Sequence, residues 1–206
     1  RYKKFFILVN NFLRGLKMKQ YPVNLKIDYP EKSNKLTAVF RLVLIIPIVI
    51  ILSFISSYAE ALSLAVVLMI LFREKYPKWW FDWNLALTKF WLRIAAYGLL
   101  MRDEYPSTET DQAVQVEIPY PDVKKDLNRW MPLVKWFLAI PHFIVLVFMF
   151  IAVVFCSILA WFTILFTGRY PKGIFDFVEG FLRWSLRVNA YAFLLTTDEY
   201  PPFKLG

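Results

Sequence analysis

Two long stretches of the chain are almost entirely apolar. Between Leu42 and Phe72 there is no Lys or Arg and Glu60 is the only acid, and between Trp136 and Gly168 there is no charged residue. These gaps are 31 and 33 residues long. A spanning helix needs roughly 20 apolar residues, and one straight helix over either gap would be about 50 Å long, which exceeds a span. Each gap therefore predicts a helical hairpin, which either spans the membrane or is re-entrant.

The basic residues orient these hairpins. All 25 Lys and Arg lie outside the two gaps, so both ends of each gap are basic. Lys and Arg prefer the cytoplasmic side of a membrane. We therefore expect both ends of each hairpin and both termini to be cytoplasmic, with turns near residues 56–58 and 155–157.

Alternation of apolar and polar residues predicts a short strand before each gap. The alternation covers residues 23–27 and 114–118. A period of two over five residues is a strand signal. Because an isolated strand is only marginally stable, we expect these two strands to lie side by side on the cytoplasmic face.

The chain repeats itself with an offset of 91 to 95 residues. Arg41 corresponds to Lys135, and the Asp-Glu-Tyr-Pro sequence at 103–106 corresponds to that at 198–201. The matches divide the chain into a basic amphipathic segment at 1–20, a first unit at 21–106 and a second unit at 107–206. Tyr-Pro dipeptides recur in both units, where we interpret them as turns and helix starts.

Each unit ends in a predicted amphipathic helix with a narrow polar stripe, which we expect to lie in the membrane interface with the stripe towards water. The stripe is either an ion-pair seam, between the units or with another subunit, or a solvated face with support from pairs four residues apart. Its members are Asp82, Lys89 and Arg93 in the first unit and Asp176, Glu179, Arg183 and Arg187 in the second.

The second gap lies within a set of distinctive motifs: Leu138-Ala139-Ile140-Pro141-His142, Leu165-Phe166-Thr167-Gly168-Arg169-Tyr170-Pro171 and Tyr200-Pro201-Pro202-Phe203. With them the chain resembles a bacterial membrane family catalogued as a domain of unknown function, number forty-three eighty-nine. The first unit is degenerate, because Glu74-Lys75 replaces Gly-Arg and Ile48 stands where His would be. The resemblance covers 21–203 and implies a two-unit protein of the bacterial inner membrane, with no catalytic residue carried over.

Composition agrees with a membrane protein of mainly α fold. The chain is 58% hydrophobic and carries a net charge of +9, which excludes a disordered chain and argues against an ordinary soluble domain. A single cysteine, Cys156, excludes an internal disulfide framework. The fold class that we predict is two tandem repeats, each with a short β-strand, a transmembrane or re-entrant helical hairpin and an interfacial amphipathic helix, in a multi-pass protein.

Two isolated polar residues lie within the gaps. His142 is the only histidine and follows Pro141 directly. It is either a proton relay or ligand, or a polar side chain that bonds backbone carbonyls freed by the proline. Glu60 either lines an ion path or caps the distal turn of the first hairpin.

No sequence motif indicates a chemistry. The chain has no Gly-rich phosphate loop, nucleophile elbow, zinc spacing or paired-carboxylate motif, so we predict no catalytic, cofactor-binding or metal-binding residue. Because the basic residues are spread along the predicted cytoplasmic segments, we expect anionic lipid headgroups as partners, and no nucleic acid. The primary hypothesis is a non-enzymatic accessory or scaffold subunit that binds other membrane protein subunits in a larger inner-membrane complex; the alternative is a small transporter or lipid-handling protein.

Overall fold

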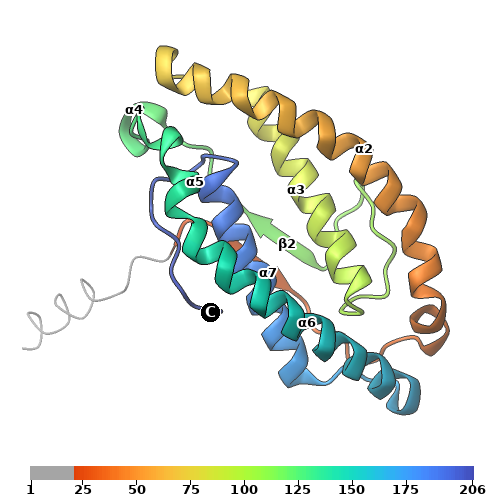
Figure 1. Ribbon diagram of the computed structural model, residues 1–206. Coiled ribbons are helices and arrows are strands. Elements are labelled where there is room, and N and C mark those ends of the chain that lie inside the picture. The colour runs from red at the N-terminus through yellow and green to blue at the C-terminus, as the bar shows by residue number, and fades with distance from the viewer. Residues whose placement is uncertain (1–20) are drawn as a thin grey trace, which may run out of the picture.

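The computed structural model describes residues 21–206, except for the side chains of 56–63, so the predicted amphipathic segment at 1–20 and the Glu60 side chain lie outside the described residues. Most of the described chain is helical (Figure 1). Its elements are β1 (Asn24–Ile27), α2 (Lys35–Arg73), α3 (Lys78–Gly98), β2 (Val114–Glu117), α4 (Val123–Asp126), η1 (Met131–Leu133), α5 (Lys135–Leu138), α6 (Ile140–Thr167) and α7 (Lys172–Ala192).

The two apolar gaps form continuous helices, and the prediction of hairpins is wrong. Helix α2 runs without interruption for 39 residues and α6 for 28. Neither expected turn region contains Gly or Pro. A turn there would free backbone N–H and C=O groups within an apolar surface, whereas a continuous helix satisfies them internally. Pro47 lies inside α2 and does not end it.

The two strands pair with each other as expected, in antiparallel register with Asn24 opposite Glu117 and Ile27 opposite Val114. One face of this small sheet is buried and the other carries exposed or half-exposed polar side chains. The period-two pattern in the sequence therefore correctly predicted both the strands and their buried face.

The strands are exchanged between the two units. Strand β1 precedes α2 but packs against α7, whereas β2 precedes α6 but packs against α3. Helix α2 packs along α3, and α6 along α7, so α3 and α7 are inner helices. Twelve of the 21 residues of α7 are buried, so most of this predicted interfacial helix packs inside the protein.

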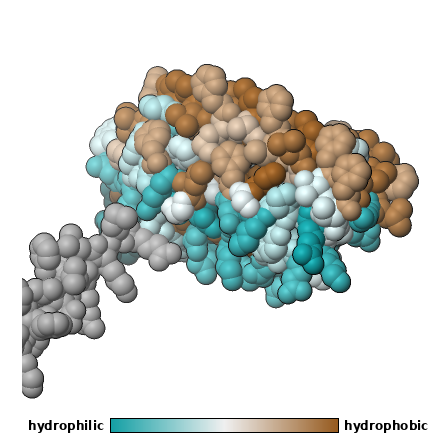
Figure 2. Space-filling model, turned by 90° about the horizontal axis from the view of Figure 1, so that it is seen from below, coloured by the Kyte–Doolittle hydropathy of each residue, from teal (hydrophilic) through white to brown (hydrophobic). Residues whose placement is uncertain are grey.

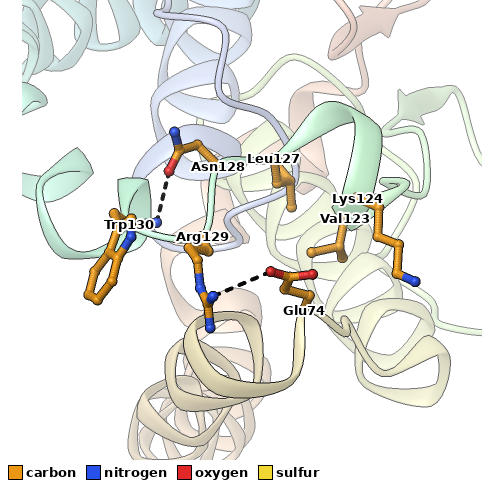
Figure 3. A pocket seen from close by; sticks show the side chains of 7 residues that line it. All are labelled: Glu74, Val123, Lys124, Leu127, Asn128, Arg129 and Trp130. Atoms are coloured by element: carbon orange, nitrogen blue, oxygen red, sulfur yellow. Dashed lines mark hydrogen bonds and ion pairs between the residues drawn. The ribbon is translucent and has the colours of Figure 1, made fainter.

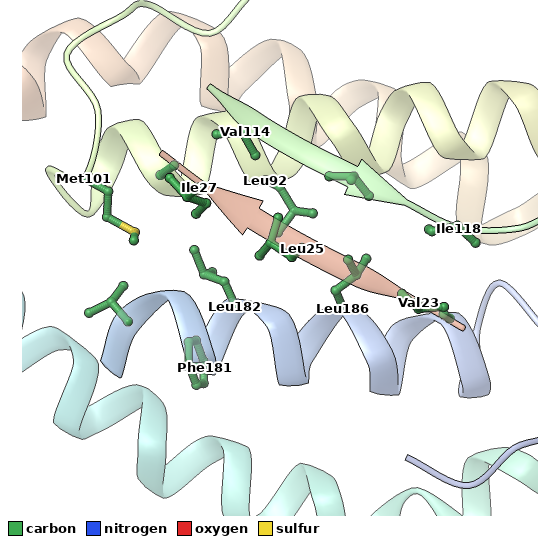
Figure 4. Close-up of a cluster of buried hydrophobic side chains, with 14 of the residues drawn as sticks. Val23, Leu25, Ile27, Leu92, Met101, Val114, Ile118, Phe181, Leu182 and Leu186 are labelled. Carbon is green, nitrogen blue, oxygen red and sulfur yellow. The ribbon is translucent and has the colours of Figure 1, made fainter. Parts of the chain in front are cut away.

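The main core lies where the sheet meets the inner helices (Figure 4). Leu25 of β1 is fully buried there, next to Leu92 of α3 and Leu182 and Leu186 of α7. Because side chains from both units fill this one core, the units form a single folding unit rather than two separate domains.

Candidate functional site

The two long helices carry many exposed apolar side chains. We call this surface the apolar face: the exposed apolar side chains between Leu36 and Phe72 of α2 and between Ile140 and Phe166 of α6. Phe72 is 77% exposed and Phe166 is 81% exposed. Soluble monomers rarely expose apolar patches above a few hundred Å². Two helical segments, Lys35–Ile55 and Ile140–Thr167, are long and apolar enough to cross a membrane.

A polar side lies opposite the apolar face. Figure 2 shows hydrophobic residues gathered along one side of the molecule and hydrophilic residues along the other. The outer face of the sheet is part of this polar side, because Lys26, Gln115 and Glu117 are exposed. The molecule is therefore amphipathic as a whole, and not only along single helices.

The two long helices are antiparallel, and each C-terminal end is bonded by the segment that precedes the other helix. At one end, Ser33 N donates to Gly168 O at 2.9 Å, and Lys35 Nζ donates to Phe166 O at 3.2 Å. At the other end, Arg129 Nε and Nη2 donate to Leu71 O at 3.0 and 2.6 Å. Lys35 and Arg129 are 94 positions apart in the sequence, so equivalent basic residues cap the C-terminal carbonyls of both long helices.

Each unit contains a buried ion pair at equivalent positions. Arg41, 2% exposed, pairs with Asp103, and Lys135, fully buried, pairs with Asp198 at 2.6 Å. Burial lowers the pKa of Lys135, and its hydrogen bond and attraction to Asp198 oppose that shift. These pairs were not predicted from the sequence, although Arg41 and Lys135 flank the two gaps and each unit ends in Asp-Glu-Tyr-Pro.

Aromatic rings flank both pairs. The Arg41 guanidinium lies 4.3 Å from the centre of the Tyr97 ring, and Lys135 Nζ lies 5.3 Å from that of Tyr191. Each cation also donates to a carbonyl of the segment that carries its aspartate or tyrosine: Arg41 to Tyr97 O at 2.9 Å and Lys135 to Thr197 O at 2.8 Å. These bonds tie the start of the long-helix region to the end of each unit.

Two tyrosines hold the exchanged strands. Tyr29 follows β1 and donates to Tyr170 O in the second unit, and Tyr120 follows β2 and donates to Tyr76 O in the first at 2.6 Å. The Tyr29 ring packs edge-on to Phe175 at 5.0 Å between ring centres. The recurring Tyr-Pro motifs are therefore also the contacts between the units.

The predicted polar stripe does not form one surface. Asp82 and Asp176 are exposed and pair with Lys78 and Lys172 on their own helices. Lys89 is half-exposed, and Arg93 donates to Ser107 O.

The second half of the α7 stripe bonds the free edge of β1 instead of facing water. Glu179 Oε1 accepts from Ile27 N at 3.0 Å, and Arg183 Nε donates to Leu25 O at 2.8 Å. Arg187 is 6% exposed and donates to Gly206 O. An edge strand leaves backbone groups unpaired, and these side chains satisfy two of them. The prediction that Arg187 stays at the water boundary is wrong.

His142 lies in an aromatic cluster at the start of α6. It is fully buried, and its Nδ1 accepts from Trp184 Nε1 at 3.0 Å. The Phe203 ring stacks on it with 3.9 Å between ring centres, and the Tyr200 ring lies at 4.9 Å. The bond from Trp184 replaces the backbone bonds that the sequence suggested. Among the described residues, no group of three His, Cys, Asp or Glu could hold a metal ion.

A pocket of about 500 Å³ opens at the C-terminal end of α2 (Figure 3). We call it the α2-end pocket; its lining residues are Glu74, Val123, Lys124, Leu127, Asn128, Arg129 and Trp130. Arg129 Nη1 lies 3.6 Å from Glu74 Oε1, and Asn128 Oδ1 accepts from Trp130 N at 2.9 Å.

Together these features define a mostly helical protein of two similar units with one broad apolar face. A family model described as a domain of unknown function (DUF4389) matches residues 35–108 and again 129–204. The chain belongs to this family, and the two matches are consistent with a duplicated unit. Searches of curated proteins and of solved structures return no match for this chain.

Proposed function

We propose that the protein is a non-enzymatic scaffold that rests with its apolar face in one leaflet, on the cytoplasmic side of the bacterial inner membrane. The observation that carries this proposal is the position of the polar side along the length of the long helices (Figures 1 and 2). In Figure 1, the axes of α2, α3, α6, α7 and the strands lie roughly along one common line across the molecule, some pointing one way and some the other.

Crossing the membrane is the less favourable arrangement. If α2 and α6 spanned the bilayer, the strands would also run across it, and Lys26 and Glu117 would lie at hydrocarbon depth. A charged side chain there costs about 3 kcal/mol or more. With the helices in the membrane plane, the outer face of the sheet points towards water.

Helix length supports the same arrangement. At about 1.5 Å per residue, the 39 residues of α2 extend for about 58 Å, against a hydrocarbon thickness of about 30 Å. The exposed side chains of α2 are apolar from Leu42 to Ile51 and again at Leu68 and Phe72, so the apolar region is too long for an upright span. A helix in the membrane plane has no such length limit, and it leaves both basic ends on one side.

The scaffold role is supported by the positions of the ion pairs, which hold the fold together. The Arg41–Asp103, Lys135–Asp198 and Arg183–Glu179 pairs all lie within the fold and tie its parts together. The exposed polar side remains available for another subunit of a membrane complex. The alternative role in lipid handling is favoured by one observation, the α2-end pocket beside the apolar face.

A photo-crosslinking residue placed at Gln115 or at Phe148 tests the scaffold proposal. Gln115 is exposed on the polar side and Phe148 is 68% exposed on the apolar face. In intact cells we expect Gln115 to yield one recurrent protein adduct and Phe148 to yield lipid adducts. Only lipid or water adducts at Gln115, with the protein in the membrane fraction, would contradict the scaffold role.

A further inference from the structure

We infer that the α2-end pocket binds the phosphate of an anionic phospholipid, whose acyl chains lie on the neighbouring apolar face. This inference rests on the proposed membrane position and adds a defined lipid site to it. The lining combines two cations, one carboxylate, an amide and an indole (Figure 3). A phosphate is the ligand whose charge and acceptor oxygens suit the cations Lys124 and Arg129.

Arg129 is held in place before any ligand arrives. Its Nε and Nη2 both donate to Leu71 O, and its side chain is still 43% exposed. The fixed guanidinium therefore presents Nη1 to the pocket without further loss of side-chain freedom. Its contact with Glu74 at 3.6 Å is a half-exposed pair, which a phosphate can replace.

Lys124 supplies the second cation. It is exposed on α4 and lines the pocket. Its neighbour Lys125 is 81% exposed, pairs with Asp122 at 3.4 Å and does not line the pocket. The two adjacent lysines thus carry the same charge but differ in their access to the pocket.

The pocket lies at the border of the apolar face. Trp130 lines it and is 63% exposed, and an indole in this position suits the headgroup level of a bilayer. Phe72 at the end of α2 and Trp136 and Phe137 of α5 are exposed nearby in the chain. A lipid with its phosphate in the pocket would therefore have apolar side chains on which to place its acyl chains.

The other end of the long-helix pair lacks this combination. Lys35 is the equivalent of Arg129, but Leu36 stands where Trp130 stands, and Gly168 stands where Glu74 stands. Lys35 caps α6 through Phe166 O just as Arg129 caps α2. Lys35 is therefore a matched control for removing a capping cation without touching the pocket.

Vesicle flotation of the full chain tests the inference, with phosphatidylcholine vesicles compared against vesicles that also contain phosphatidylglycerol. Wild type should float with both and prefer the anionic vesicles. Lys124→Gln should lower that preference about fivefold, since an exposed ion pair with a phosphate held in the pocket contributes up to about 1 kcal/mol. Lys125→Gln should change it less than twofold, and Glu74→Gln should increase it.

A second pair of variants tests the fixed guanidinium. Arg129→Gln should lose the preference for phosphatidylglycerol, whereas Lys35→Gln should keep it, with folding of both checked by circular dichroism. Equal effects of Lys124→Gln and Lys125→Gln would overturn the proposed lipid site. Release of wild type from the anionic vesicles by millimolar glycerol phosphate, as effective as release by added lipid, would overturn it too. Failure of wild type to float on phosphatidylcholine alone would instead contradict the proposed membrane position.

Discussion

The two units keep the same skeleton but differ at the start of their long helices. Both have a buried cation–aspartate pair and a tyrosine that bonds the other unit. In the second unit His142 packs with Trp184 and Phe203, whereas the equivalent residues of the first unit are Ile48, Phe90 and Thr108.

The first-unit counterpart is an aliphatic cluster. Ile48 and Phe90 are buried there with Leu52 and Ile94. The same backbone therefore accepts either a polar aromatic cluster or an apolar one. Features present in both units are those that the fold requires, and features present in one unit are free to serve other purposes.

Breaking the ion pairs should have the largest effect. Asp198→Asn leaves Lys135 fully buried without its counter-charge, which should cost about 3 kcal/mol or more of unfolding free energy. Asp103→Asn should cost less, because Arg41 keeps its bonds to Tyr97 O and Arg102 O. Chemical unfolding in detergent measures both, and equal losses would contradict this difference between the units.

The loss in Asp198→Asn should shrink at higher pH. Burial lowers the pKa of Lys135, and the variant lacks the opposing effect of Asp198. Between this lowered pKa and the ordinary Lys value of 10.5, the unfolded state binds the proton and the folded state does not, so stability rises with pH. Unfolding of the variant at pH 7 and pH 9, each relative to wild type, should show the smaller deficit at pH 9. If the loss of stability in Asp198→Asn grew with pH, the charge on the buried Lys135 could not be its cause.

Substitutions in the polar stripe should have the next largest effect, and that effect should differ between the two units. Arg183→Met removes the donor to Leu25 O and should destabilise by about 2 kcal/mol, because a backbone carbonyl at the strand edge loses a charged partner. Its equivalent Lys89 is half-exposed, and Lys89→Met should change stability by less than about 0.5 kcal/mol. Thermal unfolding of the two variants checks this, and a larger loss for Lys89→Met would reverse the assignment.

Two substitutions should convert the cluster around His142 into the apolar cluster of the first unit. His142→Ile alone leaves the Trp184 indole N–H without its acceptor and should cost about 1–2 kcal/mol. Adding Trp184→Phe removes that donor and recreates the Ile–Phe pair of the first unit, so much of the loss should return. A double-mutant cycle measures the coupling, and additive losses would show that the Trp184–His142 bond adds nothing.

The smallest effect should come from the helix ends. Glu74 has φ 50° at the end of α2, where α6 has Gly168 at φ 70°. A left-handed backbone favours glycine, so Glu74→Gly should stabilise by roughly 0.5–1 kcal/mol. Glu74→Ala, which removes the same contact with Arg129 and keeps the strain, should give no such gain in the same unfolding assay.

The sequence predicted the local features well. Alternation at 23–27 and 114–118 identified both strands, and the repeat identified which segments are equivalent. The strands' exchange between units was not predictable, because it depends on which helix each strand contacts rather than on any pattern within the strand. The bonds of Glu179 and Arg183 to β1 follow from that exchange and were missed with it.

The hairpin prediction failed for an instructive reason. Basic residues at both ends of a gap indicate that both ends lie on one side of a membrane. A hairpin satisfies that condition, and so does a single long helix that lies in the membrane plane. The absence of Gly and Pro near residues 56–58 and 155–157 favoured the continuous helix, and the charge pattern alone could not distinguish them.

Depth measurements along α2 test most directly whether this helix lies in the membrane plane. Phe40, Phe54 and Phe72 are all exposed on the apolar face, and about 48 Å of helix separates the first from the last. Each is changed to Cys in a Cys156→Ser background, spin-labelled and measured in liposomes by oxygen and nickel accessibility, with Lys26→Cys as the aqueous reference. A helix that lies in the membrane plane predicts similar depths within one leaflet for all three labels and an aqueous environment for Lys26→Cys. A label at Phe54 that lies about 10 Å or more deeper than both others, with Phe40 and Phe72 in opposite headgroup regions, would contradict it and establish a spanning helix.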